Sequence, residues 1–546
     1  MELLKYILNL FKIGKAEISE DINSKDFVVV DAVVNAMINI KYSGYFALIP
    51  NNLNLNAHFE KYPLVDYGFV EIDGKFLTVN SNDTTSSFFD KDRMLYLLDL
   101  LNIIPANNKD SISEDGFVSI NSTVLRNYFK DYLSYLNYLI DTSVLISDNH
   151  YTVGKKSIGY KFAPQYENAE LTAINYPVKV SVQLFQGLQE VVYDSISRSF
   201  QQNPLLDYPY LNHWYSQKML NIDIVKATKY AYLLMKKKFD LGYEHWDKNK
   251  DKWSPKRNDF CRKYPKTQYN AIMHNIKSIE MNNYNAKIDT KVYRLHSVIT
   301  NMQKDYRNFL TYNGNQLVAI DISNSQPYLM CLLFNPLFWQ ANSDSLNIYQ
   351  LPSSIHKMFS SAHLDEIKNY VETLNDDMLS DYKNKASEGV IYEYIRDTAN
   401  SQLGRSLVRD DAKVMMLIVF FSSNKFFHQA DAELKRLFAS LHPEIYGLIK
   451  LIKRHNHASF ACLLQSIESE IILHRCCEKI WEEGAQQVPI FTVHDSISTT
   501  VINTEFVKNI MRDELTNTIG LPPHLEEEVW MEEKLKHQDI LIKINQ

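Results

Sequence analysis

Short runs of alternating or continuous apolar residues dominate the beginning of the chain. DFVVVDAVV, GYFALIP and YGFVEIDGKFLTV are separated by Asn and Gly, which favour turns. The pattern predicts a small β-rich or mixed unit over residues 1–84.

The spacing of apolar residues becomes helical after this unit. RMLYLLDLLNII and VLRNYFKDYLSYLNYLIDT are predicted as helices, and Ser122 or Thr123 offers an N-cap hydroxyl to the second. VLISDNHYTVGKKSIGYKF then predicts two strands around a Gly-Lys-Lys turn.

Helices followed by a basic hairpin resemble a winged helix-turn-helix, here over residues 85–165. Lys155, Lys156 and Lys161 would lie on the wing. Such a module commonly binds DNA. The alternative is a structural helix–hairpin unit with an exposed lysine turn.

Residues 166–290 are predicted to be mainly helical and basic. Between Trp214 and Lys277 there are 15 Lys and Arg against 6 Asp and Glu, with Trp246, Trp253 and Tyr264 interleaved. This stretch is either a solvated basic face or a strip that follows a phosphate backbone, where clustered cations gain from counterion release.

Composition narrows the class of protein. The chain has 546 residues, 45% of them hydrophobic, and a formal net charge of −7, so it is ordinary globular material with several domains. Its five cysteines show no CxxC or Cys/His spacing, which argues against a zinc site or a disulfide framework. The longest apolar run, Val414 to Phe421, is far too short to span a bilayer. Without a signal-peptide pattern at the N-terminus, we expect a soluble cytoplasmic protein with no membrane partner.

Four separated segments carry the candidate chemistry of the C-terminal half. The first reads R-L-H-S from Arg294, and the second is VAIDISNSQPYL, in which an apolar run ends at Asp321. The third is R-x3-K-x3-L-x3-F from Arg409, whose spacing keeps these residues on one side of a helix. The fourth, VPIFTVHDSISTT, is a β-run with a His-Asp pair that ends at Asp495. Each segment alone is common in proteins.

Together and in this order, the segments resemble the family A DNA polymerases, the group of bacterial DNA polymerase I. They are similar to that family's R-L-S-S-x-x-x-N-L-Q segment, motif A (D-x-S-x-x-E), motif B (R-x3-K-x7-Y-G) and motif C (V-H-D-E). The resemblance covers approximately residues 215–535. The matching residues are Arg294, Leu295, Ser297, Asn301, Gln303, Asp321, Ser323, Arg409, Lys413, Val493, His494 and Asp495.

The resemblance implies a right-hand polymerase of the α+β class. Palm and fingers would occupy residues 291–546 and a thumb-like region residues 166–290, after an N-terminal mixed region that includes the possible winged helix. The activity implied is template-directed addition of deoxynucleotides to a primer 3′ end, with a DNA primer-template and dNTPs as partners. No proofreading exonuclease is expected, because the nearest acid pair, V-E-I-D, has the wrong order for D-x-E. The combination suggests replication of a phage, plasmid or mobile element.

Asp321 and Asp495 are the predicted metal ligands. Nucleotide transfer builds charge on phosphate oxygens, and two divalent ions about 4 Å apart can serve both sides of the displacement. Mg²⁺ prefers oxygen ligands, and Mn²⁺ is an alternative. The resemblance implies that the two strands are neighbours and that the carbonyl of Ile322 joins the carboxylates.

Cations are predicted around the triphosphate. Arg409 and Lys413 would face it, and Lys413 would donate a proton to the leaving pyrophosphate. The resemblance implies that Phe421 lies near the templating base. It also implies a set of residues that contact the primer-template: Arg294, Asn301, Gln303, Gln465 and His494.

Several positions depart from the family. Gln326 replaces a glutamate that blocks a ribose 2′-hydroxyl, so it keeps the bulk and loses the charge. Ser496 replaces a second acid, and single-subunit phage-type RNA polymerases also carry His-Asp-Ser there. Leu417 and Ser422 replace an aromatic residue and a glycine. These changes leave open an RNA polymerase or primase of the single-subunit type. A third reading is a non-catalytic DNA-binding replication protein.

Overall fold

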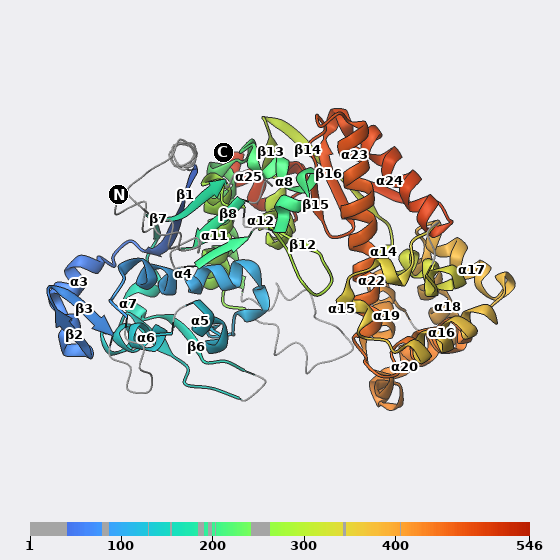
Figure 1. The fold of residues 1–546 in the computed structure, drawn as a ribbon, viewed down its shortest axis with the longest axis horizontal. Coiled ribbons are helices and arrows are strands. Elements are labelled where there is room, and N and C mark those ends of the chain that lie inside the picture. The colour runs from blue at the N-terminus through green and yellow to red at the C-terminus, as the bar shows by residue number, and fades with distance from the viewer. Residues whose placement is uncertain are drawn as a thin grey trace, which may run out of the picture. The chain divides into compact units, whose positions relative to one another are not determined.

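The computed structural model divides the chain into two compact units. One comprises residues 1–45 and 176–203, and the other residues 46–175 and 204–546. Figure 1 shows the ribbon with its elements labelled. The structure describes residues 41–78, 87–128, 130–152, 156–183, 190–194, 199–202, 204–241, 263–284, 286–341, 345–404 and 406–545. The run DFVVVDAVV, predicted as a strand, lies outside these residues.

A four-stranded sheet of order β1-β7-β8-β9 includes most of what is described of the first unit. Its strands are β1 (Lys41–Pro50), β7 (Leu171–Gln183), β8 (Glu190–Asp194) and β9 (Ser199–Gln202). The prediction of helix from residue 166 onward is therefore wrong for these strands. The reason is visible in LTAINYPVKVSVQ, where valines alternate with polar residues at the strand period.

The second unit begins with small helices and hairpins. Its first elements are α3 (Leu55–Lys61), η1 (Leu64–Tyr67), β2 (Phe69–Ile72), β3 (Lys75–Thr78), α4 (Lys91–Asn107), η2 (Lys109–Ser111), β4 (Val118–Ser119), α5 (Ser122–Tyr128), α6 (Tyr132–Asp141), β5 (Leu145–Ser147), β6 (Gly159–Phe162) and α7 (Pro164–Glu167). β5 and β6 form the expected antiparallel hairpin, and β4 joins it in the order β4-β6-β5. The N-cap of α5 is Asn121, not Ser122 or Thr123. Its side-chain oxygen accepts from the backbone amides of Thr123 and Val124.

Helices follow over residues 204–284, as the sequence predicts for that part of the chain. They are η3 (Pro204–Asp207), α8 (Pro209–Ser216), α9 (Ile224–Leu241) and α11 (Pro265–Glu280), with the short strand β10 (Leu220–Ile222) between α8 and α9. α11 packs on both α4 and α9. The buried His274 of α11 lies 3.4 Å from Asp99 of α4. Of the aromatics in the predicted basic strip, Trp246 and Trp253 fall outside the described residues, and Tyr264 precedes α11.

A six-stranded antiparallel sheet organises the C-terminal part of the described chain. Its order is β10-β13-β14-β16-β15, and β17 pairs with β14. The bounds are β13 (Leu310–Tyr312), β14 (Asn315–Ile322), β15 (Phe491–Val493), β16 (Ser496–Thr500) and β17 (Leu525–Val529). β14 is central because its run Leu317 to Ile320 is buried throughout, as expected for a strand covered on both faces.

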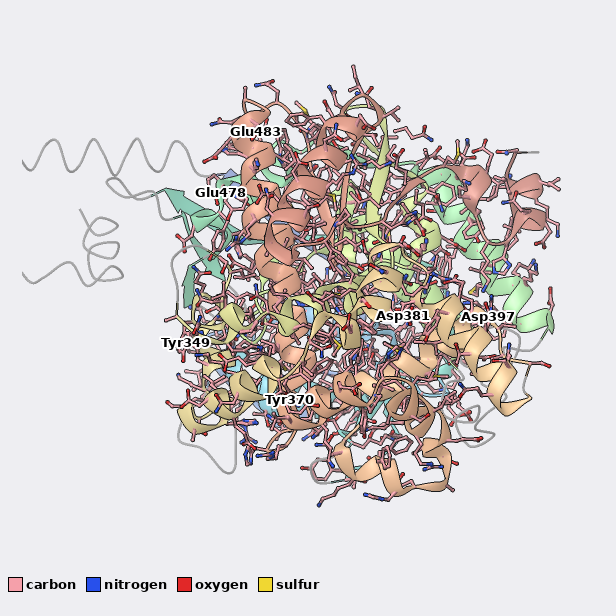
Figure 2. All side chains as sticks on the ribbon, turned by 90° about the vertical axis from the view of Figure 1, so that its right-hand side faces the viewer. Tyr349, Tyr370, Asp381, Asp397, Glu478 and Glu483 are labelled. Carbon is pink, nitrogen blue, oxygen red and sulfur yellow. The ribbon has the colours of Figure 1, made fainter. Side chains whose placement is uncertain are left out.

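Short elements connect the first helices to this sheet, and a large set of helices follows it. The connecting elements are β11 (Lys287–Ile288), β12 (Leu295–His296), α12 (Val298–Asn301) and α13 (Lys304–Arg307). The helices after β14 include α14 (Ser325–Leu329), α15 (Ser353–His356), α16 (Ser361–Glu372), α17 (Asp376–Ser387), α18 (Ile391–Leu403), α19 (Arg409–Phe421), α20 (Glu433–Leu441), α21 (Pro443–Ile452), α22 (Ser459–Ser469), the π-helical segment η10 (Glu470–Cys476), α23 (Cys477–Glu483), α24 (Thr504–Ile519) and α25 (Gln538–Asn545). Tyr370 of α16, labelled in Figure 2, ties two of them together, because its hydroxyl donates to the Glu444 carbonyl of α21 at 2.9 Å.

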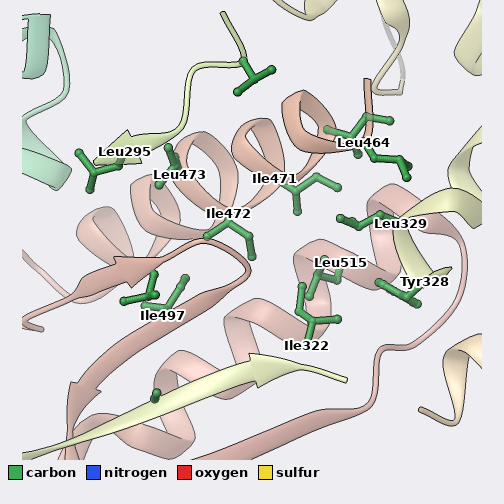
Figure 3. Packing of buried hydrophobic residues seen from close by; sticks show 14 of the residues in the cluster. Leu295, Ile322, Tyr328, Leu329, Leu464, Ile471, Ile472, Leu473, Ile497 and Leu515 are labelled. Atoms are coloured by element: carbon green, nitrogen blue, oxygen red, sulfur yellow. The ribbon is translucent and has the colours of Figure 1, made fainter. Parts of the chain in front are cut away.

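One apolar core joins the sheet to its covering helices. Figure 3 shows Ile322 of β14 and Ile497 of β16 with Leu464 of α22, Ile472 of η10 and Leu515 of α24, all buried in one cluster. The described chain is thus a mixed helix-and-strand protein with an antiparallel central sheet, in agreement with the α+β expectation. None of its described helices combines the length and apolar character needed to cross a membrane.

Candidate active site

Asp321 and Asp495 are brought together by the pairing of β14 with β16. Asp321 lies near the end of β14, directly opposite Ser496 in the antiparallel register. His494 and Asp495 form the turn between β15 and β16, and the closing pair of that hairpin is Val493 with Ser496. His494 adopts a φ of +57°, which a tight hairpin turn requires. The tip of one hairpin therefore holds Asp495 next to Asp321.

The environment of the pair raises the proton affinity of both carboxylates. Burial and the charge of Asp495 raise the pKa of Asp321 to about 7. Burial also raises the pKa of Asp495, while a hydrogen bond from Ser325 and the charges of Arg294 and Lys413 oppose the shift. Within the described part of the chain, no hydrogen bond or ion pair reaches the Asp321 carboxylate.

A third carboxylate, Glu526 of β17, was missed by the sequence reasoning. It lies opposite Asp321 in the pair of β14 with β17 and so shares its face of the sheet. Its charge contributes to the raised pKa of Asp321. The Ser323 hydroxyl donates to Glu526 at 2.7 Å and lies 2.9 Å from Nδ1 of His524. The run LEEEV, with three consecutive acids, was the available signal.

The donor set fits a hard divalent cation. Two half-buried carboxylates with raised pKa values lose their mutual repulsion when a cation lies between them, and a strand carbonyl such as that of Ile322 adds a further oxygen. Among the described residues, no three His, Cys, Asp or Glu side chains are grouped so as to hold a metal ion. The candidate here consists of two carboxylates, so substrate oxygens and water would complete the coordination.

Helix α19 presents the predicted cationic face. Arg409, Lys413 and Leu417 are exposed and Phe421 is half-buried, so all four follow one open side of the helix. Arg409 forms an ion pair with Glu393 of α18, and its guanidinium lies 5.3 Å from the ring centroid of Tyr392.

Lys413 is available to a ligand. It makes no hydrogen bond or ion pair with any residue that the structure describes. Its positive charge lowers the pKa of Asp495.

Two buried lysines hold the C-terminal end of α19. Lys453, the C-cap residue of α21, is 2% exposed and donates to the carbonyls of Val419 at 2.7 Å and Ser422 at 3.0 Å. Lys435 of α20 is fully buried and donates to the Ser422 hydroxyl and the Ser423 carbonyl, both at 2.9 Å. Cations at a helix C-terminus satisfy its free carbonyls and complement its dipole. The position of the Arg409–Lys413 face therefore depends on this buried pair.

Arg294 is bound to a buried glutamate that the sequence reasoning also missed. Its Nη2 donates to both carboxylate oxygens of Glu468, at 2.6 and 2.7 Å. Gln326, on the first turn of α14, donates from Nε2 to the same carboxylate at 2.9 Å. Burial raises the pKa of Glu468 to about 7, although the charge of Arg294 lowers it. No local pattern distinguishes Glu468, since its partners lie far away in the sequence.

The remaining predicted residues are more dispersed. Asn301 donates from its amide to the Asn107 side chain of α4 at 2.9 Å. Gln303 precedes α13, Gln465 is half-buried on α22, and His494 is exposed at the hairpin tip. Among the described residues, no hydrogen bond links these four side chains to Asp321 or Asp495.

Comparisons with known proteins add little to this geometry. No family model matches the chain, and no curated protein matches it. Solved structures that match include the POL domain of Pol1 from M. smegmatis in complex with DNA primer-template and dNTP. That match has a TM-score of 0.29 and 11% sequence identity, and it covers 60% of this chain and 71% of that chain. At this TM-score the likeness has no bearing on what the present chain does.

Proposed function

We propose that the chain is a template-directed nucleotide polymerase that extends a primer with deoxynucleotides. The observation that carries the proposal is the register of β14 with β16, which brings Asp321 next to the Asp495 hairpin tip. Two half-buried carboxylates with raised pKa values lie near Lys413, an exposed lysine that has no hydrogen-bond or ion-pair partner among the described residues, and this suits chemistry on a polyanionic phosphate substrate.

Asp321, Asp495 and the carbonyl of Ile322 would hold two Mg²⁺ ions, for which Mn²⁺ could substitute. These ions supply charge stabilisation on the attacking and leaving oxygens of an in-line displacement. Lys413 binds the triphosphate and donates a proton to the pyrophosphate oxygen as the bond to the α-phosphorus breaks. Arg409 binds the outer phosphates once it leaves Glu393.

The rest of the assignment follows the same proposal. Residues 291–546 act as palm and fingers, with Phe421 near the templating base. The helices α8, α9 and α11, from the region 166–290, act as the thumb. Arg294, Asn301, Gln303, Gln465 and His494 would contact the primer-template, and Gln326 the nucleotide sugar.

Primer extension tests the proposal directly. The full chain is incubated with Mg²⁺, a labelled primer on a DNA or RNA template, and either dNTPs or NTPs, beside Asp321→Asn and Asp495→Asn. We expect extension with dNTPs and a loss of at least about a hundredfold in each variant. Extension that is unchanged in both variants would remove the proposal.

The same assay distinguishes the alternatives. Comparable rates with NTPs and dNTPs would favour an RNA polymerase or primase, the alternative that Ser496 and Gln326 leave open. No extension on any template, together with DNA binding by the full chain, would favour a non-catalytic replication protein.

A further inference from the structure

Glu468 is the meeting point of three distant parts of the chain. It lies on α22 and is 2% exposed, Arg294 precedes β12, and Gln326 lies on α14. One carboxylate thus accepts two hydrogen bonds from a guanidinium and one from an amide. A buried carboxylate is costly unless it is paired in this way, so the arrangement is specific.

This arrangement fixes the orientation of the Gln326 amide. The Gln326 amide nitrogen donates to Glu468, so the carbonyl oxygen Oε1 of the same amide faces away from that carboxylate. Oε1 is buried and has no hydrogen-bond partner in the described chain. An unpaired buried acceptor is costly, and a hydroxyl from a ligand would relieve that cost.

The network of Glu468, Arg294 and Gln326 lies beside the two candidate metal ligands. Gln326 follows Asp321 by five residues, and the charge of Arg294 lowers the pKa of Asp495. The charge of Asp495 in turn acts on Glu468. A nucleotide bound at Asp321 and Asp495 therefore has this network as a near neighbour.

We propose that Glu468 is a positioning residue that determines sugar selectivity: it holds Arg294 in the site and turns the Gln326 carbonyl toward the nucleotide sugar. The inference rests on the proposed polymerase function. Because a carbonyl accepts from a hydroxyl, the site admits ribonucleotides to a measurable extent. A freely turning amide at position 326 would favour the extra hydroxyl less.

The kinetic test compares Glu468→Gln with the unchanged full chain, using dNTPs and NTPs separately in primer extension. We expect kcat/KM for NTPs to fall about tenfold more than kcat/KM for dNTPs. A change of this size corresponds to the loss of about one hydrogen bond. The matched control is Glu470→Gln, two residues further along, because Glu470 is half-buried but pairs with Arg475 instead. This control should leave the NTP to dNTP ratio unchanged. An equal loss for both nucleotide classes, or no NTP use by the unchanged chain, would overturn the inference.

An exchange of the two side chains tests the network without relying on activity. Gln326→Glu places two carboxylates at hydrogen-bond distance with only Arg294 to neutralise them, and should lower the thermal unfolding midpoint. Adding Glu468→Gln restores one carboxylate and one amide, so the double variant should unfold at a higher temperature than Gln326→Glu alone. A double variant no more stable than Gln326→Glu would contradict the network.

The two proposals fail in different ways. If neither the unchanged chain nor Asp321→Asn extends a primer, the polymerase function is wrong, whatever the exchange variants show. If the unchanged chain extends primers with dNTPs and Glu468→Gln keeps the sugar ratio, the function stands and the role of Glu468 is wrong.

Discussion

Asp321 lies opposite Glu526 in the antiparallel pair of β14 and β17, so two carboxylates share one face of the sheet beside the Asp495 hairpin. Burial and these negative charges keep the proton on Asp321 up to about pH 7. Like charges that act on a partly buried carboxylate destabilise a fold, and such a cost is commonly found at functional sites.

Replacing Asp321 with Asn should therefore stabilise the protein at alkaline pH. Folded Asp321 keeps its proton up to about pH 7, whereas the unfolded residue loses it near pH 4, so wild-type stability falls as pH rises across this interval. We expect Asp321→Asn to be more stable than wild type by about 2 kcal/mol at pH 8 and by little at pH 4. Urea unfolding at both pH values measures the difference. Asp513→Asn, exposed on α24, is the control, and a stabilisation that does not depend on pH would contradict the electrostatic explanation.

Divalent cations should stabilise the folded chain through the same pair. A cation bound to Asp321 and Asp495 in the folded state raises the unfolding midpoint in proportion to its occupancy. We expect millimolar MgCl₂ to raise the midpoint of wild type measurably but not that of Asp321→Asn or Asp495→Asn. NaCl at the same ionic strength separates site binding from screening. An equal rise in all three proteins would argue against a metal site at these residues.

Variants of Lys413 should distinguish its role in nucleotide binding from its role in proton transfer. Lys413→Ala removes an exposed cation from the open face of α19, so KM for the nucleotide should rise and kcat should fall by about a hundredfold or more. Lys413→Arg keeps the charge but is a poor proton donor, so it should restore KM more than kcat. Leu417→Ala, one turn away on the same exposed face, is the control and should change neither by much. Full activity in Lys413→Ala would show that Lys413 takes no part in the mechanism.

Lys453 should matter for both stability and nucleotide binding. Lys453→Met leaves the C-terminal carbonyls of α19 without their buried donor, which we expect to cost about 2–3 kcal/mol of unfolding free energy. The helix would then hold Arg409 and Lys413 less firmly, so KM for the nucleotide should also rise. Urea unfolding and steady-state kinetics measure the two effects. Lys450→Met, on the exposed side of α21, the helix that Lys453 caps, should have little effect on either.

The sequence was sufficient where the signal is local. An apolar run that ends at Asp321 predicted the central strand, and the four-residue spacing from Arg409 predicted the open face of α19, because strand and helix periods are local properties. The hairpin β5–β6 was predicted for the same reason.

The sequence was insufficient where a residue depends on distant partners. Glu468 and Arg294 are 174 residues apart, and an acid on an amphipathic helix ordinarily faces solvent. Lys453 also resembles a surface lysine in sequence, yet it is buried because carbonyls from another helix meet it. Such roles can be recognised only when the long-range packing is known.

The helix–hairpin module formed by α4, α5, α6 and the β4-β6-β5 sheet gives a last prediction. α6 (Tyr132–Asp141), the helix before the hairpin, contains no Lys or Arg. Lys156 pairs with Asp148 at 2.8 Å and Lys161 with Glu167 at 3.3 Å, while Lys155 lies outside the described residues.

These charges favour a structural module over a DNA-binding wing. The logarithm of the DNA-binding constant falls linearly with the logarithm of the salt concentration. Each phosphate contact makes this slope steeper by about one unit. We therefore expect the double variant Lys156→Ala, Lys161→Ala of the full chain to bind duplex DNA within about twofold of wild type, with an unchanged salt slope. Fluorescence anisotropy over a range of salt concentrations measures both quantities. A slope lower by about two units would instead show that these lysines contact phosphates, and the wing would then be part of the DNA-binding surface.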